Sequence, residues 1–338
     1  MNFSFAKMAG IVVAMIATVI PAKATLTLTQ TAIADGFSLS TFVSGYSAQY
    51  GPLAQGISSN GQVITGSLLN TKIYVFDDVD GQKLSNAVNS VSYTCITGNC
   101  NFAMATAGSQ VYGAQLQGGV YEKFNSDGTF APIASLQAAG LRDNLGMWGN
   151  PVNGHIISAS TQGLVDIDPV AGTFRVIVPN IFPDGVTVSP DGTIAYVENG
   201  GTIQSYNIAT GALLHTYATG HSPDGTGVIS SNNNLNGDVI VNNNDGTVGL
   251  LDPTKANGDP SQFVIIANNG TRGDFVSPDL NNGTLFLSQT DQVARLSCGP
   301  DCSIGGVPST TPEPASWALF GAGLVSVECL RRRVNRRA

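Results

Sequence analysis

The chain has 338 residues, of which 42% are hydrophobic and only 11% are charged, with 40 glycines and a formal net charge of −8. This composition excludes a disordered chain, a collagen and a basic nucleic-acid-binding protein. Glu and Lys, the usual surface residues of helices, are scarce, whereas Asp and Gly abound. A mostly helical protein is therefore not expected either.

The N-terminus has the pattern of a secretory signal. Lys7 precedes an apolar run over residues 8–20, and Ala22 and Ala24 supply the small-x-small site that a signal peptidase needs. We expect cleavage after Ala24, which makes residues 1–24 a signal peptide. The alternative is an N-terminal membrane anchor, but the run is shorter than the ~20 apolar residues that cross a bilayer.

The body of the chain repeats one unit six times, with a period of about 45 residues. Each unit is two short strands joined by a polar turn. Five of the six are followed by a glycine turn and a third strand, and another strand precedes each unit. The units span 62–77, 109–125, 154–168, 192–207, 237–252 and 283–297. Six repeats of four strands predict an all-β fold, a six-bladed β-propeller, rather than a β-sandwich or a solenoid.

The sixth unit ends at Ser297 without the glycine turn and the outer strand that follow the other units. We predict that the missing strand comes from the N-terminus, where residues 37–43 follow Asp35-Gly36 and alternate in the same way. Its pairing with the last blade would close the ring and remove two exposed sheet edges. We therefore assign residues 25–307 to the propeller.

The repeat units resemble those of the propeller superfamily that includes NHL-type proteins, quinoprotein-like repeats and virginiamycin B lyase. The shared feature is a strand, a polar turn, a second strand that ends in Asp and then a glycine turn, as in 163–172. The resemblance covers nearly all of the body and implies the propeller fold. It implies no set of catalytic residues, because these families share a scaffold and not a chemistry.

Four of the five cysteines form two close pairs. Cys95 and Cys100 bracket one short turn, Cys298 and Cys302 bracket another, and Cys329 stands alone near the C-terminus. In an exported protein each pair is expected to form a local disulfide. A zinc site is the alternative, but no histidine lies near any cysteine in the sequence.

Four loops that enter the predicted innermost strands carry the candidate site residues. Propellers bind ligands at this mouth of the central channel. The candidates are Asp143, Asp184, Asp224 and Asp274. Converging carboxylates attract a hard cation, so Ca²⁺ is the one cofactor considered, and otherwise none is expected. The alternative, which we favour, is that Asp-Gly pairs simply make turns.

The C-terminus, residues 308–338, resembles the PEP-CTERM sorting signal of Gram-negative bacteria that make exopolysaccharide. A Pro-Glu-Pro motif precedes an apolar stretch over 315–330 and an arginine cluster. The signal residues are Pro312, Glu313, Pro314, Arg331, Arg332 and Arg333. The resemblance implies recognition by exosortase, a membrane peptidase, after export across the inner membrane. The short hydrophobic helix would anchor the protein transiently, before it reaches the cell surface or the extracellular space. Glu328 within the stretch departs from the usual pattern, and an ordinary single-span anchor is the alternative.

These observations lead to one expected function and two alternatives. We expect a non-enzymatic propeller that binds exopolysaccharide or another surface protein. The first alternative is a metal-dependent lyase or lactonase that acts at the channel mouth, and the second is a purely structural protein of the biofilm matrix. Residues 25–311 carry 8 basic and 21 acidic side chains, so no nucleic-acid partner is expected.

Overall fold

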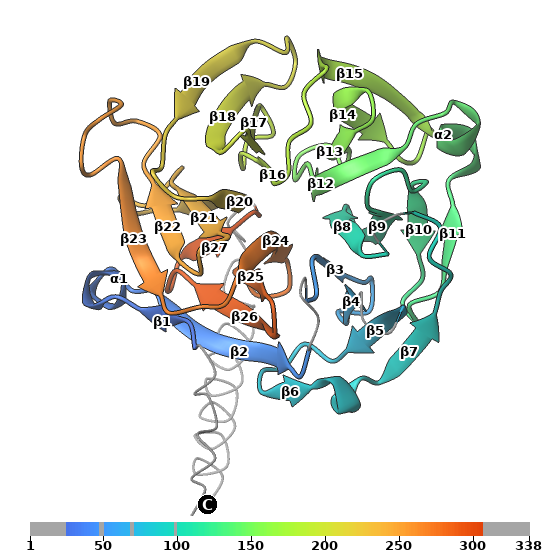
Figure 1. The fold of residues 1–338 in the computed structure, drawn as a ribbon, viewed down its shortest axis with the longest axis horizontal. Helices are drawn as coiled ribbons and strands as arrows, with labels where there is room; N and C mark the ends of the chain where they lie inside the picture. The colour runs from blue at the N-terminus through green and yellow to red at the C-terminus, as the bar shows by residue number, and fades with distance from the viewer. Residues whose placement is uncertain (1–24, 47–50, 68–70, 98–99, 307–338) are drawn as a thin grey trace, which may run out of the picture.

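The computed structural model describes residues 25–46, 51–67, 71–97 and 100–306. The predicted signal peptide and the predicted sorting segment lie outside these residues. Within them, six mainly antiparallel sheets stand around a central axis, which confirms the six-bladed propeller (Figure 1). No helix in this described part of the chain is long and apolar enough to cross a membrane.

Each blade is built around four strands. Blade 1 contains β3 (Gln55–Ile57), β4 (Val63–Ser67), β5 (Lys72–Phe76) and β7 (Asn89–Ser92), and blade 2 contains β8 (Phe102–Ala107), β9 (Gln110–Gln115), β10 (Glu122–Phe124) and β11 (Phe130–Pro132). Blade 3 contains β12 (Asp143–Gly149), β13 (Ile156–Ser160), β14 (Gly163–Asp168) and β15 (Thr173–Pro179), and blade 4 contains β16 (Val186–Val188), β17 (Ile194–Asn199), β18 (Thr202–Asn207) and β19 (Leu213–Tyr217). Blade 5 contains β20 (Pro223–Ser231), β21 (Val239–Asn243), β22 (Val248–Leu251) and β23 (Phe263–Asn268). Blade 6 contains β24 (Gly273–Asp279), β25 (Thr284–Gln289), β26 (Gln292–Ser297) and β2 (Ser38–Ser44).

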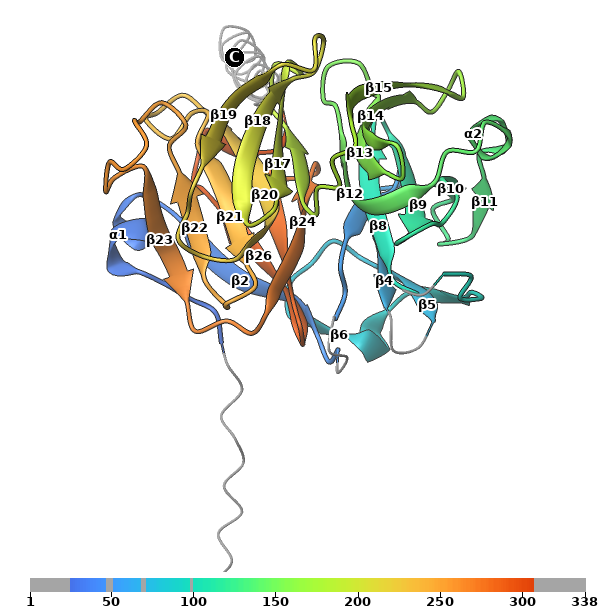
Figure 2. The ribbon, with the colours of Figure 1, turned by 45° about the horizontal axis from the view of Figure 1, so that its top comes forward.

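Burial falls from the axis toward the rim. Every residue of β13, β20, β21 and β24 is buried, because neighbouring blades cover both faces of these strands. At the rim, Leu213 to His215 of β19 are exposed. The short helices α1 (Gln30–Ala34) and α2 (Ala134–Ala138) also lie at the rim, beside β23 and β15 respectively (Figure 2).

The innermost strands contact one another around the axis and nearly close the channel. A Cβ atom at Gly185 would lie 1.9 Å from the carbonyl oxygen of Asp224, and one at Gly225 would lie 2.6 Å from the amide nitrogen of Val276. Only glycine permits so close an approach of two backbones. A void of about 10 Å³ remains between the innermost strands.

The predicted N-terminal strand closes the ring. β2 pairs antiparallel with β26, with Ser38 opposite Ser297 and Thr41 opposite Ala294. Its Phe42 is fully buried, with its ring centroid 4.8 Å from that of Phe286. The pairing confirms that the predicted N-terminal strand supplies the outer strand of the last blade. The sheet continues outward from β2 to the short parallel strand β6 (Gln82–Lys83).

Two further strands extend blade 5, and the sequence predicted neither. β1 (Thr27–Leu28) pairs with the outer strand β23. β27 (Cys302–Ile304) pairs antiparallel with the inner edge of β20, with Ile304 opposite Ile229. The chain after Ser297 therefore returns toward the axis, where Ile304 is fully buried.

Both predicted disulfides are present. Cys95 is bonded to Cys100 and Cys298 is bonded to Cys302, each within one short loop. The second bond joins the end of the last blade to the start of β27. It thereby fixes the turn that leads the chain from blade 6 to the neighbouring blade 5.

Candidate functional site

The entry face of the propeller, where loops lead into the innermost strands, carries the four predicted aspartates. The structure brings three of them together around one arginine. Arg272 forms an ion pair through Nη1 with Asp274, and its Nη2 lies 3.5 Å from Oδ2 of Asp224. Asp184 interacts electrostatically with the same charges. We call Asp184, Asp224, Arg272 and Asp274 the mouth cluster.

Asp143 belongs to a separate network. Its side chain is fully buried, with Oδ1 3.5 Å from the hydroxyl of Ser158, which lies 2.8 Å from the hydroxyl of Tyr121. Burial raises the pKa of the Asp143 carboxyl well above its usual range. Among the described residues, no ion pair links Asp143 to the mouth cluster, so the predicted convergence holds for three carboxylates and not for four.

Burial and mutual repulsion set the protonation of the mouth cluster. Burial raises the pKa of Asp184 to about 7, assisted by the negative charges of Asp274 and Glu198 and opposed by Arg272. Burial also raises the pKa of Asp224 well above its usual range, and Asp274 and Asp184 add to the rise. The positive charge of Arg272 thus interacts with three carboxyl groups in a largely buried site.

The two Asp-Gly pairs at the mouth differ in local structure, since Asp184 and Gly185 form a bend before β16, whereas Asp224 and Gly225 lie within β20. Gly185 and Gly225 follow their aspartates where adjacent innermost strands nearly touch, and neither has a positive φ. Close approach of the blades, and not turn geometry, explains glycine at these positions. The aspartates before them are consequently drawn into the ring, where Asp224 is 0% exposed.

The mouth cluster does not fit a divalent metal ion. In the described part of the chain, no three His, Cys, Asp or Glu side chains are grouped so that they could hold a metal. Arg272 already lies beside the carboxylates of Asp224 and Asp274 that would have to bind the ion. A Ca²⁺ site needs six or more oxygen ligands within about 2.6 Å, and this arrangement does not provide them.

The opposite, exit face holds a larger pocket of about 790 Å³. Its walls are the ends of β8, β12 and β24, the loop after β20, and the segment 299–306 that β27 brings across the axis. The lining includes Pro151, Asn232, Leu280, Pro300, Asp301 and Ser303. Of the described residues that line this exit-face pocket, Asp301 alone carries a charge.

The sequence interpretation missed the exit-face pocket, although a signal is present. Three loops that follow innermost strands are rich in asparagine, at 150–154, 232–237 and 279–283. Many of these amides support the loops: Asn150 Oδ1 accepts from the amide of Val152, and Asn281 donates to Gly61. The wall made by 299–306 leaves no such signal, because it depends on the pairing of β27 with β20.

Comparisons with known proteins show the fold. No protein family model matches the chain, and no curated protein matches it. A gluconolactonase from Xanthomonas campestris has a similar structure, with a TM-score of 0.58, 15% identity and coverage of 80% of this chain and 94% of that one. A luciferin-regenerating enzyme has a TM-score of 0.56, 11% identity and coverage of 80% and 99%. An auxiliary nutrient binding protein from Bacteroides thetaiotaomicron has a TM-score of 0.51, 10% identity and coverage of 77% and 76%. At these identities the similarities establish the propeller fold, and they do not assign an activity or a ligand to this chain.

Proposed function

We propose that this propeller is an exported, non-catalytic protein of the cell surface that binds a neutral polysaccharide in the exit-face pocket. The observation that carries the proposal is the pocket itself. Its volume of about 790 Å³ lies within the range of small-molecule sites and suits a few sugar units of a longer chain.

The pocket walls match the two kinds of surface that a sugar presents. Amide and hydroxyl groups, including those of Asn232 and Ser303, can exchange hydrogen bonds with sugar hydroxyls, since an amide both donates and accepts. Pro151, Leu280 and Pro300 offer apolar surface to the C–H faces of the rings. Because Asp301 is the one charged side chain among the described lining residues, the pocket favours an uncharged ligand over a polyanion.

Delivery to the cell surface rests on the two ends of the chain. The signal peptide over 1–24 would start export, and exosortase would read the Pro-Glu-Pro motif in 308–338. The two disulfides support this route, because such bonds persist in oxidising compartments. Intact mass of the protein from the producing cells tests it. A mature form that begins at Thr25 and lacks the arginine tail is expected, and a major form that retains 331–338 would contradict sorting.

A metal-dependent enzyme at the entry face is the weaker candidate. The mouth cluster does not fit a divalent ion, because Arg272 occupies the carboxylates that the ion would need. We therefore derive no catalytic step through a metal at this site.

Affinity electrophoresis of the purified full chain in gels that contain dextran tests the binding proposal. Retardation by neutral dextran, and little by anionic alginate, is expected. Asn232→Trp should fill the pocket and weaken retardation at least tenfold. Asn234→Trp is the matched control, because Asn234 is also exposed and lies two residues away, outside the pocket lining. No retardation of the wild type by dextran, or equal retardation of both variants, would overturn the proposal.

A further inference from the structure

Some polar side chains of the exit-face pocket are already engaged in the loops that carry them. The amide group of Asn150 donates to the backbone oxygen of Gly192 and accepts from the backbone amide of Val152. The amide group of Asn282 also donates and accepts within its own loop. These groups hold the pocket walls in place and have little hydrogen-bonding capacity left for a ligand.

Three other lining side chains are free to bind a ligand. Within the described part of the chain, the side chains of Asn232, Asp301 and Ser303 form no hydrogen bond or ion pair with another residue. Asn232 and Asp301 are exposed, so their hydrogen bonds are made to water, which the hydroxyls of a sugar can replace. The pocket therefore has both the space and the unused polar groups that a ligand needs.

The pairing of β27 with β20 brings these three side chains to one wall of the pocket. The last pair of that ladder is Ser231 opposite Cys302. Asn232 is the next residue after Ser231, and Asp301 and Ser303 lie on either side of Cys302. An amide, a carboxylate and a hydroxyl consequently lie at the same end of one short ladder.

The backbone at Asp301 is held in an uncommon conformation. Its φ is 58°, in the left-handed region, and the next residue is bonded to Cys298 through the disulfide. Non-glycine residues stay in this region where the surrounding structure fixes them, and such positions cluster at ligand-binding sites. A ligand thus meets a carboxylate on a fixed backbone, which reduces the entropy that is lost on binding.

We propose that Asp301 is the specificity-determining residue of the exit-face pocket and accepts hydrogen bonds from two neighbouring hydroxyls of one sugar ring. The inference rests on the proposed function and narrows its ligand to a neutral polysaccharide with free vicinal diols. A carboxylate has two oxygens and only accepts, so it can bind both hydroxyls and needs both as donors. Such charge-assisted hydrogen bonds are roughly twice as strong as neutral ones. Asn232 and Ser303 can donate to the other oxygens of the same ring.

The test compares retardation of the purified full chain by gels that contain dextran with retardation by gels that contain O-methylated dextran. The methylated polymer is neutral and has the same backbone, but its sugar hydroxyls no longer donate. The wild type should be retarded by dextran and at least tenfold more weakly by the methylated polymer. Asp301→Asn should weaken retardation by dextran at least tenfold and change retardation by the methylated polymer less than twofold. Asp35→Asn, the same change at an exposed residue at the end of α1, is the matched control and should behave as the wild type does.

Asp301→Asn is expected to fold, because asparagine also adopts the left-handed conformation and no described partner is lost. An unchanged unfolding temperature checks this. Equal retardation of the wild type and Asp301→Asn by dextran would overturn the role of Asp301 and leave the polysaccharide proposal standing. Equal retardation of the wild type by the two polymers would do the same without recourse to any variant. No retardation of the wild type by dextran would overturn both proposals.

Discussion

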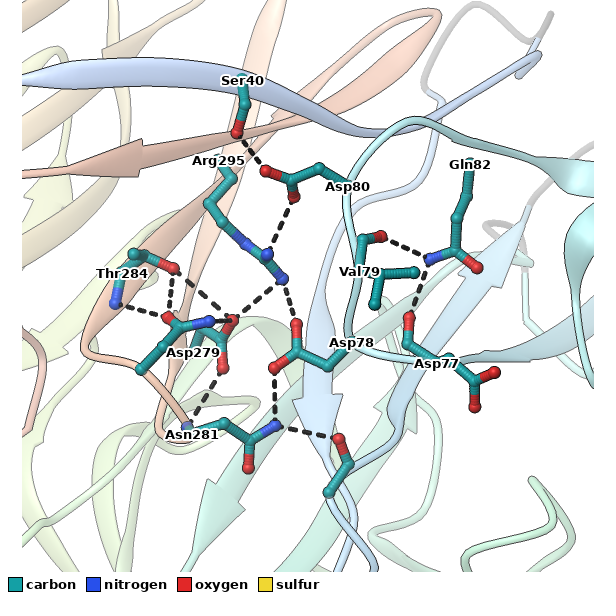
Figure 3. Close-up of polar contacts among 12 residues, drawn as sticks. Ser40, Asp77, Asp78, Val79, Asp80, Gln82, Asp279, Asn281, Thr284 and Arg295 are labelled. Carbon is teal, nitrogen blue, oxygen red and sulfur yellow. Dashed lines mark hydrogen bonds and ion pairs between the residues drawn. The ribbon is translucent and has the colours of Figure 1, made fainter.

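Nη1 of Arg295 lies 2.8 Å from Oδ1 of Asp80, across the seam where the last blade meets the first (Figure 3). The same guanidinium pairs with Asp78 and, at 3.0 Å, with Asp279. Asp80 in turn accepts a hydrogen bond of 2.6 Å from the hydroxyl of Ser40 in β2. One buried side chain of blade 6 thus joins the first blade and, through Asp80, the N-terminal strand that completes the ring.

Removal of this cation should weaken closure of the ring. Arg295→Met would leave Asp279, which is 0% exposed, without its positive partner. Breaking a buried ion pair from one side costs about 3–5 kcal/mol, and we expect a loss of this size in the free energy of unfolding. Arg142→Met is the control, because within the described part of the chain Arg142 hydrogen-bonds only to the backbone oxygens of Gln137 and Leu141, and its loss should cost less than about 1 kcal/mol. Guanidinium denaturation measures both, and equal losses would refute the closing role of Arg295.

Deletion of the N-terminal strand should be more damaging than deletion of the tail. Without residues 25–45, β26 would lose its outer partner, and Phe76 and Phe286 would lose contact with the buried ring of Phe42. We expect a sharply lower unfolding temperature or aggregation, because an exposed strand edge pairs readily with other chains. Deletion of residues 308–338 should leave the unfolding temperature unchanged. Thermal unfolding of both truncations decides this, and an N-terminal deletion as stable as the full chain would mean that β2 does not hold the ring closed.

The repeat of a strand, a polar turn and a second strand made the blades predictable, because alternation and glycine turns are local signals. The closing strand was predictable for a different reason. The last repeat lacked its outer strand, and residues 37–43 had the pattern of a strand but belonged to no repeat unit. β27 was not predictable, since three residues carry no periodicity and their partner, Ile229 to Ser231, lies far back in the chain. The mouth aspartates were found by their position in each repeat. Their burial was not foreseen, because it depends on how closely Gly185 and Gly225 let the blades approach.

Loss of the second disulfide should loosen the exit face. The double variant Cys298→Ser, Cys302→Ser removes the bond that precedes β27, and the entropy of so short a loop predicts a loss of about 2 kcal/mol. Amide hydrogen exchange should rise in 302–306, and dextran binding should weaken with the pocket wall. Cys95→Ser, Cys100→Ser is the control, since that bond lies in another blade and should cost a similar amount without an effect on binding. Unchanged exchange in 302–306 would show that pairing with β20 alone holds the segment.

Stability should increase as the pH falls from 8 to 5. Burial raises the pKa of Glu122 to about 7, and burial together with Asp252 raises that of Asp238 to about 7, against some opposition from Lys255. In the unfolded chain these carboxyls titrate near pH 4, so the folded form binds more protons between about pH 4 and 7. The stability that they contribute is fully present below the unfolded pKa and is lost as the pH rises through the folded value. The surface aspartates have the opposite sign: hydrogen bonds lower the pKa of Asp259, and the stability that it contributes is lost only in stronger acid. We therefore expect the unfolding temperature to rise by several degrees from pH 8 to pH 5.

Two variants test which carboxyls cause this rise. Asp238→Asn should flatten the rise in unfolding temperature, and Asp259→Asn should leave it unchanged over the same pH range. Scanning calorimetry in buffers of equal ionic strength measures all three proteins, and a wild-type unfolding temperature that is flat or falls toward pH 5 would contradict the raised pKa values of the buried carboxyls.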